Sequence, residues 1–145
     1  MSRSLRDITV KEFMSASLVT FSLDTDIFAA IKLLVGRGVS GAPVLDQFGN
    51  IVGMLSERDC MKVALNAAYH DEFGGKVSDF MTRNPISVDA AASILEVAEI
   101  FFTNPFKRLP VIHQQRLVGQ VSRSDVLKAI DRFVQVDEMD SSQPR

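Results

Sequence analysis

The sequence predicts a mixed α/β fold (α+β) in which two β-α-β-β-α repeats pack with pseudo-two-fold symmetry. Three observations lead to this prediction: the second half of the chain repeats the first, each half alternates short extended stretches with amphipathic helices, and the halves differ in length only at a turn. With 145 residues, 46% of them apolar, the chain suits one compact fold with a sizeable core. Because one repeat alone would leave a sheet face bare, we expect the two repeats to pack on each other.

The internal repeat is visible from its first residues onward. Residues 10–14 (Val-Lys-Glu-Phe-Met) align with residues 77–81 (Val-Ser-Asp-Phe-Met), and the apolar pattern continues in step after them. One residue is lost where the turn at 46–50 faces the shorter turn at 113–116. A length change confined to a turn is typical of a true structural repeat, because turns tolerate insertions better than strands or helices do.

Each repeat is expected to open with a short lead-in that ends in Phe-Met, followed by an extended stretch (18–21 or 85–88) and an amphipathic helix. Asp26 and Ser93 are suited to be the N-caps of these helices, since their side-chain oxygens can accept from free backbone N–H groups. The apolar residues that recur at helical spacing are Ile27, Ala30, Ile31, Leu34 and Val35, and again Ile94, Val97, Ala98, Phe101 and Phe102.

Two short apolar strands joined by a polar turn follow in each repeat, and a last helix starts at Ser56 or Ser122. The strands are expected at 42–45 and 51–55, and at 109–112 and 117–121. The resulting domain boundaries are a first repeat at 8–65, a linker at 66–76, a second repeat at 77–132 and a disordered polar tail at 137–145.

Charge and composition exclude several classes of function. The chain has 16 basic and 18 acidic residues, a net charge of −2 and no basic run, so nothing favours a nucleic acid or a membrane as partner. The single cysteine, Cys60, and the absence of a signal-peptide pattern or a long apolar stretch predict a cytoplasmic protein. No cluster has metal-ligand spacing and no nucleophile-base set can be assembled, so no metal site and no catalytic residues are predicted.

Taken together, the repeated motifs resemble a pair of CBS domains, the cystathionine-β-synthase-type repeat, over about residues 8–132. The second repeat carries the likeness in residues 77–88, 107–112 and 119–126, and the first in residues 40–46 and 53–59. The resemblance implies two CBS-type repeats that bind AMP, ADP, ATP or S-adenosylmethionine in clefts between them, with no other cofactor. It also implies a homodimer and an unidentified regulated protein, and the chain looks like the stand-alone kind.

The strongest candidates for nucleotide binding are two copies of Gly-x-x-Ser-x-x-Asp, in which the serine is Ser56 or Ser122 and the aspartate is Asp59 or Asp125. A strand that ends at a helix N-terminus offers free N–H groups to an anion, and the serine hydroxyl can add a hydrogen bond. One turn later the aspartate can accept from ribose hydroxyls, the role that this residue has in the family. The alternative is that Ser-x-x-Asp only caps the helix, and the two roles can coexist.

Other candidates depend more on the resemblance. A hydroxyl residue at the first strand, Thr20 or Ser87, lines the adenosine cleft in the family, although it could equally be a strand residue bonded locally. The basic pair Lys107-Arg108 points at phosphate in nucleotide-sensing relatives, whereas the alternative is a solvated basic turn. The first repeat has no basic pair at this place, so its cleft should differ. Further phosphate candidates, which could also be plain surface charges, are Arg58 and Arg123.

Two functions remain open from the sequence, and a third is disfavoured. The first is a regulatory sensor of adenine nucleotides, without catalysis, that works by a ligand-linked change in repeat or dimer geometry. The second is a protein-interaction or dimerisation scaffold whose clefts hold no ligand. An enzyme is the third, and the lack of a catalytic set argues against it.

Overall fold

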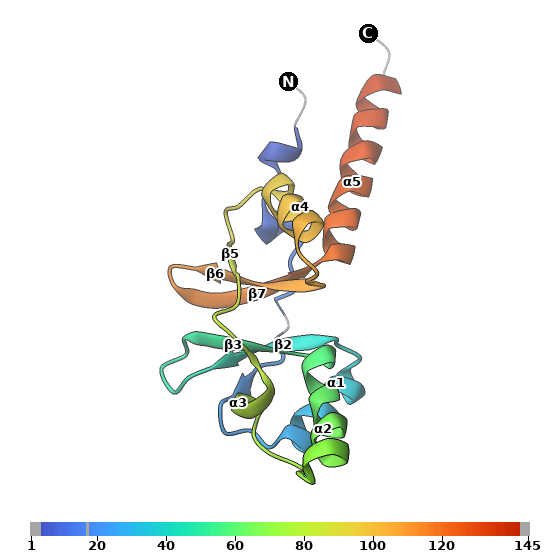
Figure 1. Cartoon of the computed structure of the whole chain (residues 1–145). Helices are drawn as coiled ribbons and strands as arrows, with labels where there is room; N and C mark the ends of the chain where they lie inside the picture. The colour runs from blue at the N-terminus through green and yellow to red at the C-terminus, as the bar shows by residue number, and fades with distance from the viewer. Residues whose placement is uncertain (1–3, 17, 143–145) are drawn as a thin grey trace. The chain divides into compact units, whose positions relative to one another are not determined.

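The computed structural model describes residues 4–16 and 18–142, with side chains up to residue 136. The chain divides into two compact units (Figure 1). Unit 2 is Leu18–Ile86, and unit 1 combines Met1–Ser17 with Ser87–Arg145. Each unit therefore contains most of one repeat together with the lead-in of the other.

The sheet of unit 2 has the strand order β1-β2-β3-β4. Strands β1 (Phe21–Ser22) and β2 (Gly41–Leu45) are parallel, and helix α1 (Ile27–Arg37) makes the crossover between them. Strand β3 (Ile51–Ser56) returns antiparallel to β2 through a tight turn. The edge strand β4 (Thr82–Arg83) comes from the second lead-in and pairs antiparallel with β3.

The helices of unit 2 start and stop where the sequence supplies caps. The Asp26 carboxylate accepts from the backbone N–H groups of Phe28 and Ala29 at the start of α1, as predicted. The helix ends at Gly38, whose φ of 63° is a left-handed conformation that suits glycine. Helix α2 (Glu57–His70) starts after Ser56, also as predicted.

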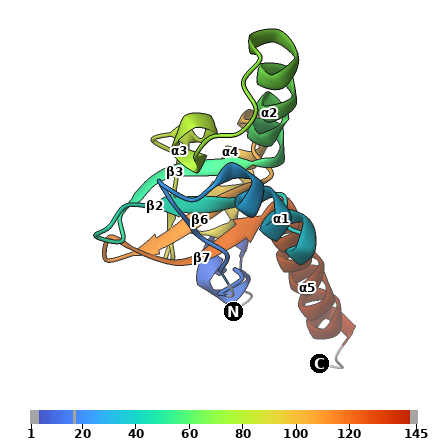
Figure 2. The same cartoon turned by 90° about the horizontal axis from the view of Figure 1, so that it is seen from below.

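The core of unit 2 lies between its sheet and its helices. Helices α1, α2 and the short α3 (Val77–Phe80) cover one face of the sheet (Figures 1 and 2). On α1, Ile27, Ala30 and Leu34 are buried, as the periodicity predicted, whereas Val35 is 76% exposed. The fully buried side chains include Ile27, Ala30, Val44, Leu55 and Val77.

Unit 1 repeats this arrangement with a sheet in the order β5-β6-β7. Strand β5 (Val88–Asp89) is parallel to β6 (Arg108–His113), which forms a hairpin with β7 (Arg116–Ser122). Helices α4 (Ile94–Thr103) and α5 (Arg123–Ser142) cover one face of the sheet (Figure 1). Each unit thus has the element order β-α-β-β-α once, which confirms the predicted mixed α/β fold of two equivalent repeats.

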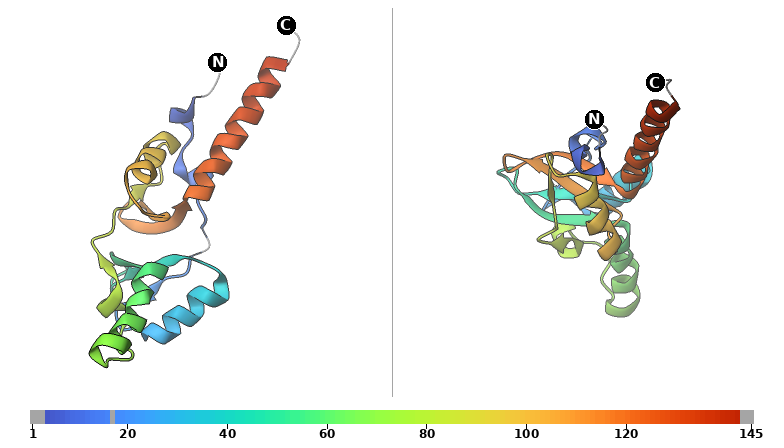
Figure 3. Two further views of the ribbon diagram at one scale, coloured as in Figure 1. Left: turned by 45° about the vertical axis from the view of Figure 1, so that its right-hand side comes forward. Right: turned by 90° about the horizontal axis from the view of Figure 1, so that it is seen from above.

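Helix α5 is longer than the sequence predicted. It runs to Ser142 and extends beyond the sheet of unit 1 (Figure 3), whereas a disordered tail was expected from residue 137. Residues 137–142 contain no glycine or proline, so no residue in this stretch interrupts the helix. The last part of the expected tail, residues 143–145, lies outside the described residues.

The exchange of lead-ins is the main feature that the sequence did not predict. In unit 1, Ser15 pairs with Gln120 of β7, just as Thr82 pairs with Met54 of β3 in unit 2. Val10 is buried in the core of unit 1, and Val77 in the core of unit 2. Each sheet is therefore extended by a segment that precedes the other repeat in the sequence.

No helix within residues 4–16 and 18–142 is both long and apolar enough to cross a membrane.

Candidate functional site

The predicted serine and aspartate pairs lie at equivalent corners of the two units, where β3 leads into α2 and where β7 leads into α5. We call Ser56 and Asp59, with their neighbours Ser40 and Gly41 on β2, the Asp59 corner. Its counterpart, the Asp125 corner, consists of Lys107, Arg108, Ser122, Arg123 and Asp125.

Both aspartates lie in the first turn of a helix and form a capping box with the serine that precedes it. In unit 2 the Asp59 Oδ2 accepts from the Ser56 backbone N–H at 3.0 Å, and the Ser56 Oγ accepts from the Asp59 N–H at 3.1 Å. The corresponding distances at Ser122 and Asp125 are 2.9 and 3.1 Å. The capping alternative is therefore part of the structure in both copies, and each carboxylate has a second oxygen for another role.

The second oxygen of Asp59 is engaged by the lead-in strand. Its Oδ1 accepts from the Thr82 Oγ1 at 3.2 Å and lies 3.7 Å from the Lys62 Nζ. The Lys62 Nζ also donates to the Phe80 carbonyl at 3.4 Å. The Asp59 side chain is only 10% exposed, so this carboxylate sits in a closed environment made by α2 and residues 80–82.

The second oxygen of Asp125 has no such neighbours. Within the part of the chain that the structure describes, Asp125 makes hydrogen bonds only with Ser122, and it is only partly buried. Lys128, the counterpart of Lys62 on α5, forms no ion pair among the described residues. Asp125 therefore presents an acceptor oxygen at the surface of unit 1, the property that a ribose hydroxyl requires.

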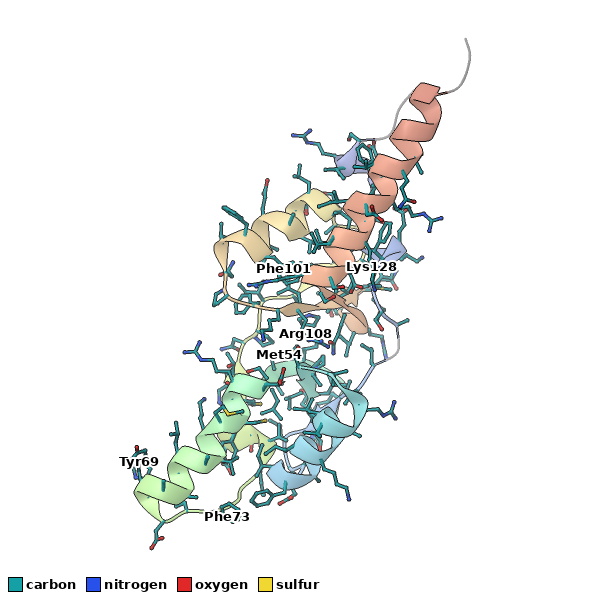
Figure 4. The ribbon with its side chains drawn as sticks, turned by 90° about the vertical axis from the view of Figure 1, so that its right-hand side faces the viewer. Met54, Tyr69, Phe73, Phe101, Arg108 and Lys128 are labelled. Carbon is teal, nitrogen blue, oxygen red and sulfur yellow. The ribbon has the colours of Figure 1, made fainter. Side chains whose placement is uncertain are left out.

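Three cationic residues of the Asp125 corner, Lys107, Arg108 and Arg123, give it a positive character. Arg108, labelled in Figure 4, starts β6 and is partly buried. Its Nη1 donates to the Oε1 of the buried Gln120 at 3.2 Å. Lys107 and Arg123 are exposed beside it, and the Arg123 backbone N–H donates to the Lys107 carbonyl at 3.2 Å. The Arg123 Nη2 donates to the Asn104 carbonyl at 3.4 Å. Guanidinium groups held in this way suit a phosphate group.

The remaining predicted residues lie nearer to open solvent. Thr20 is exposed just before β1, and Ser87 is partly buried just before β5. Neither hydroxyl forms a hydrogen bond within the described residues, so the local bonding considered for them is not made. Arg58 is exposed in the first turn of α2.

Neither the cysteine nor a metal site adds chemistry to these corners. Among the described residues, no group of His, Cys, Asp or Glu is placed to hold a metal ion. Burial, reinforced by the negative charges of Asp59 and Glu57, raises the pKa of the Cys60 thiol. The start of α2 therefore does not lower the pKa of this thiol.

Sequence reasoning missed the residues that make the two corners different. Thr82 and Lys62 engage Asp59, and Gln120 holds Arg108. Lys62 could have been noticed from its spacing, since it lies three residues after Asp59 on one helix face. Thr82 and Gln120 could not, because their contacts depend on the exchange of lead-ins and on the strand register.

Comparisons with known proteins identify related sequences for both repeats. The family model described as CBS domain matches residues 10–66 and 77–132. A CBS domain-containing protein of Dictyostelium discoideum is 30% identical over 138 residues, covering 88% of this chain and 94% of its own length. An inosine-5'-monophosphate dehydrogenase of Methanocaldococcus jannaschii is 27% identical, but the chain spans only 22% of it.

The fold agrees with solved structures of the same kind. A structure of CBSX2 in complex with AMP is 28% identical, has a TM-score of 0.76, and is covered over 97% of its length by 86% of this chain. A structure of CBSX2 from Arabidopsis thaliana is 26% identical and has a TM-score of 0.75. The match covers 88% of this chain and 97% of the CBSX2 chain. The family match spans both repeats, and the fold agrees with these structures over 86–88% of the chain. The chain belongs to the CBS domain family and carries a pair of these domains.

Proposed function

We propose that the protein is a regulatory module that binds an adenine nucleotide and performs no catalysis of its own. Binding would change the geometry of the units or of a dimer, and a regulated protein would respond to that change. AMP, ADP, ATP and S-adenosylmethionine are the candidate ligands.

The observation that carries this proposal is the chemistry of the Asp125 corner. A carboxylate oxygen available to ribose, a serine at a helix start and a half-buried arginine lie together on one unit. These are the acceptor and donors that a sugar and a phosphate require. The AMP complex of CBSX2, which shares 28% of its sequence with this chain, supports the choice of an adenosine ligand.

Isothermal titration of the full chain with each of the four ligands tests the proposal. We expect at least one of them to bind with a dissociation constant in the micromolar range, equivalent to about 8 kcal/mol. Arg108→Ala should weaken binding of the phosphate-bearing ligands by tenfold or more, since a charge-assisted contact is lost. Absence of binding by all four ligands below millimolar concentration would overturn the proposal.

Arg116→Ala is the matched control for the loss of one positive charge. Arg116 is exposed at the start of β7, whereas Ser122 ends the same strand at the Asp125 corner. Six residues of strand separate the two positions by about 20 Å, well beyond the Debye length at physiological salt. Its nucleotide affinity should therefore stay within about twofold of the wild type, a change below about 0.5 kcal/mol.

Exposed apolar side chains on the helices favour a second, compatible property, the formation of a homodimer. Phe102 and Val35 occupy equivalent positions near the ends of α4 and α1, and are 92% and 76% exposed. Met61 on α2 and Leu127 on α5 are also equivalent, at 60% and 66%. Apolar groups this exposed favour burial against a partner.

Sedimentation velocity tests whether these faces associate. We expect a dimer for the wild type and a monomer for Phe102→Asp combined with Leu127→Asp. A scaffold without a ligand predicts instead that the chain dimerises but binds none of the four nucleotides. A monomeric wild type at tens of micromolar would contradict the dimer.

A further inference from the structure

The two corners differ in charge at positions that the repeat makes equivalent. Lys107, Arg108 and Arg123 in unit 1 occupy the positions of Ser40, Gly41 and Glu57 in unit 2. One position differs in the opposite sense, since unit 2 has Arg58 where unit 1 has Ser124. The Asp125 corner therefore attracts a phosphate, whereas the first turn of α2 presents Glu57 and Asp59 together with Arg58.

The backbone of unit 2 also excludes a side chain at the position of Arg108. A Cβ atom built on Gly41 would lie 2.9 Å from the Leu55 carbonyl oxygen and 3.2 Å from the Ser56 Cα. Both neighbours belong to the backbone of β3 and cannot move aside as a flexible side chain would. The Asp59 corner is therefore built without the guanidinium that the Asp125 corner holds against Gln120.

The two carboxylates differ in availability as well. The second oxygen of Asp59 accepts a hydrogen bond from Thr82 and forms an ion pair with Lys62, and the side chain is almost closed to solvent. A ribose hydroxyl that approached it would have to replace the Thr82 hydrogen bond, so little would be gained. Asp125 has the same capping bonds and no such competitors among the described residues.

We propose that the chain binds one phosphate-bearing nucleotide, at the Asp125 corner, while Asp59 acts as a structural residue that fastens the second lead-in to α2. This inference rests on the proposed nucleotide binding and specifies where it occurs. Asp59 and Lys62 together hold residues 80–82 through the Thr82 hydroxyl and the Phe80 carbonyl. The same two positions in unit 1, Asp125 and Lys128, make no such contacts in the described structure.

The substitutions Asp125→Asn and Asp59→Asn test the difference. An asparagine keeps one oxygen that can accept from the capping serine, so each variant retains the helix cap. It replaces the second acceptor oxygen with an amide donor. The two variants are chemically identical and occupy equivalent positions, so each is the control for the other.

Titration of the full chain with AMP, and urea unfolding followed by circular dichroism, give opposite expected results for the two variants. Asp125→Asn should weaken AMP binding tenfold or more and leave the urea midpoint close to that of the wild type. Asp59→Asn should lower the urea midpoint and change the AMP dissociation constant by less than about threefold, or about 0.7 kcal/mol. The wild type should bind one AMP per chain.

Thr82→Val adds a test that does not change the charge of the corner. It removes the hydroxyl that donates to Asp59 and nearly preserves the shape of the side chain. Its loss of stability should be smaller in the Asp59→Asn background than in the wild type, because the Thr82 hydroxyl then no longer faces a charged carboxylate.

Two results would overturn the inference while leaving nucleotide binding intact: two AMP molecules per chain, or equal loss of affinity in Asp59→Asn and Asp125→Asn. Full additivity of Thr82→Val with Asp59→Asn would remove the structural role of Asp59. If the wild type binds none of the four ligands, the proposed function fails and the choice of corner fails with it. The unfolding data then still decide whether Asp59 fastens the lead-in.

Discussion

Replacing Gly119 by alanine should separate the first lead-in from the sheet of unit 1. A Cβ atom at this position would lie 2.7 Å from the Met14 Sδ and 2.7 Å from the Ser15 carbonyl oxygen. The sulfur belongs to a flexible side chain and can move, but the oxygen belongs to the backbone that pairs with β7. The lead-in therefore has to shift away from the strand.

The expected loss of stability follows from the contacts that this shift removes. The Ser15 N–H donates to the Gln120 carbonyl at 2.8 Å, and the Gln120 N–H donates to the Ser15 carbonyl at 2.9 Å. Two such bonds contribute about 1 kcal/mol each, and an added methyl group in a packed site costs about 1–3 kcal/mol. We expect the free energy of unfolding to fall by about 3–5 kcal/mol, a large part of the stability of a typical domain.

Urea unfolding followed by circular dichroism measures this change, with the same substitution elsewhere as control. Gly36 lies inside α1, and a Cβ atom there has no neighbour within 4 Å, so Gly36→Ala should raise stability by about 0.5–1 kcal/mol. Gly53→Ala should cost less than Gly119→Ala, because the backbone oxygen of Thr82 is further away, at 3.0 Å. A loss below about 0.5 kcal/mol for Gly119→Ala would refute the seating of the lead-in against β7.

Three further predictions concern the turns and the thiol. Gln114 and Gln115 join β6 to β7 with φ of 50° and 67°, so Gln115→Gly should raise the free energy of unfolding by about 1 kcal/mol, measured in urea, since glycine adopts this conformation without strain. Because burial and nearby carboxylates raise the pKa of Cys60, its thiol should react with a disulfide reagent at pH 7 more slowly than in the urea-unfolded chain, and equal rates would contradict this. The hydrogen bond from the Asn50 backbone N–H lowers the pKa of Asp46. The contribution of this carboxylate to stability is therefore present above the ordinary pKa of 3.8 and is lost as pH falls through the lowered pKa. Asp46→Asn should therefore flatten the decline of the urea midpoint between pH 5 and pH 2, and an unchanged slope would exclude this role.

Local chemistry explains the parts of the fold that the sequence predicted well. The caps at Asp26, Ser56 and Ser93 were correct because a cap depends on residues within one helical turn. The two hairpins were correct to within one or two residues, since their strands are apolar and their turns polar. The length change between the repeats indeed falls in those turns, at 46–50 and 113–116.

Features that depend on distant partners were less accessible. The extended stretch expected at 18–21 is mostly unpaired, and only Phe21–Ser22 forms a strand because only these residues reach β2. One sequence feature reflects the exchange of lead-ins: each repeat has a Phe-Met at the end of its lead-in and a glycine in its last strand. Its meaning appears only once Met81 is seen against Gly53 and Met14 against Gly119. The glycine of the Gly-x-x-Ser-x-x-Asp motif thus makes room for a methionine.

The candidate site shows the same division between local and distant information. Spacing alone placed Ser122 and Asp125 together at a helix start, and the structure has them there. The missing basic pair in the first repeat already indicated that its corner should differ. The closed environment of Asp59 could not be foreseen, because Thr82 lies 23 residues away in the sequence and arrives from the opposite lead-in.

The shared strands have a consequence for how such a chain could arise. In a polypeptide with a single copy of this repeat, the last strand of the hairpin would have an unpaired edge, because the lead-in does not pair with the strand of its own repeat. Two identical molecules could trade these segments, as in domain swapping. When both copies lie in one chain, the exchange of lead-ins is intramolecular. A short connection then gives each lead-in an effective concentration of about millimolar at the other repeat. In the doubled chain, a contact that would otherwise need two molecules forms within one.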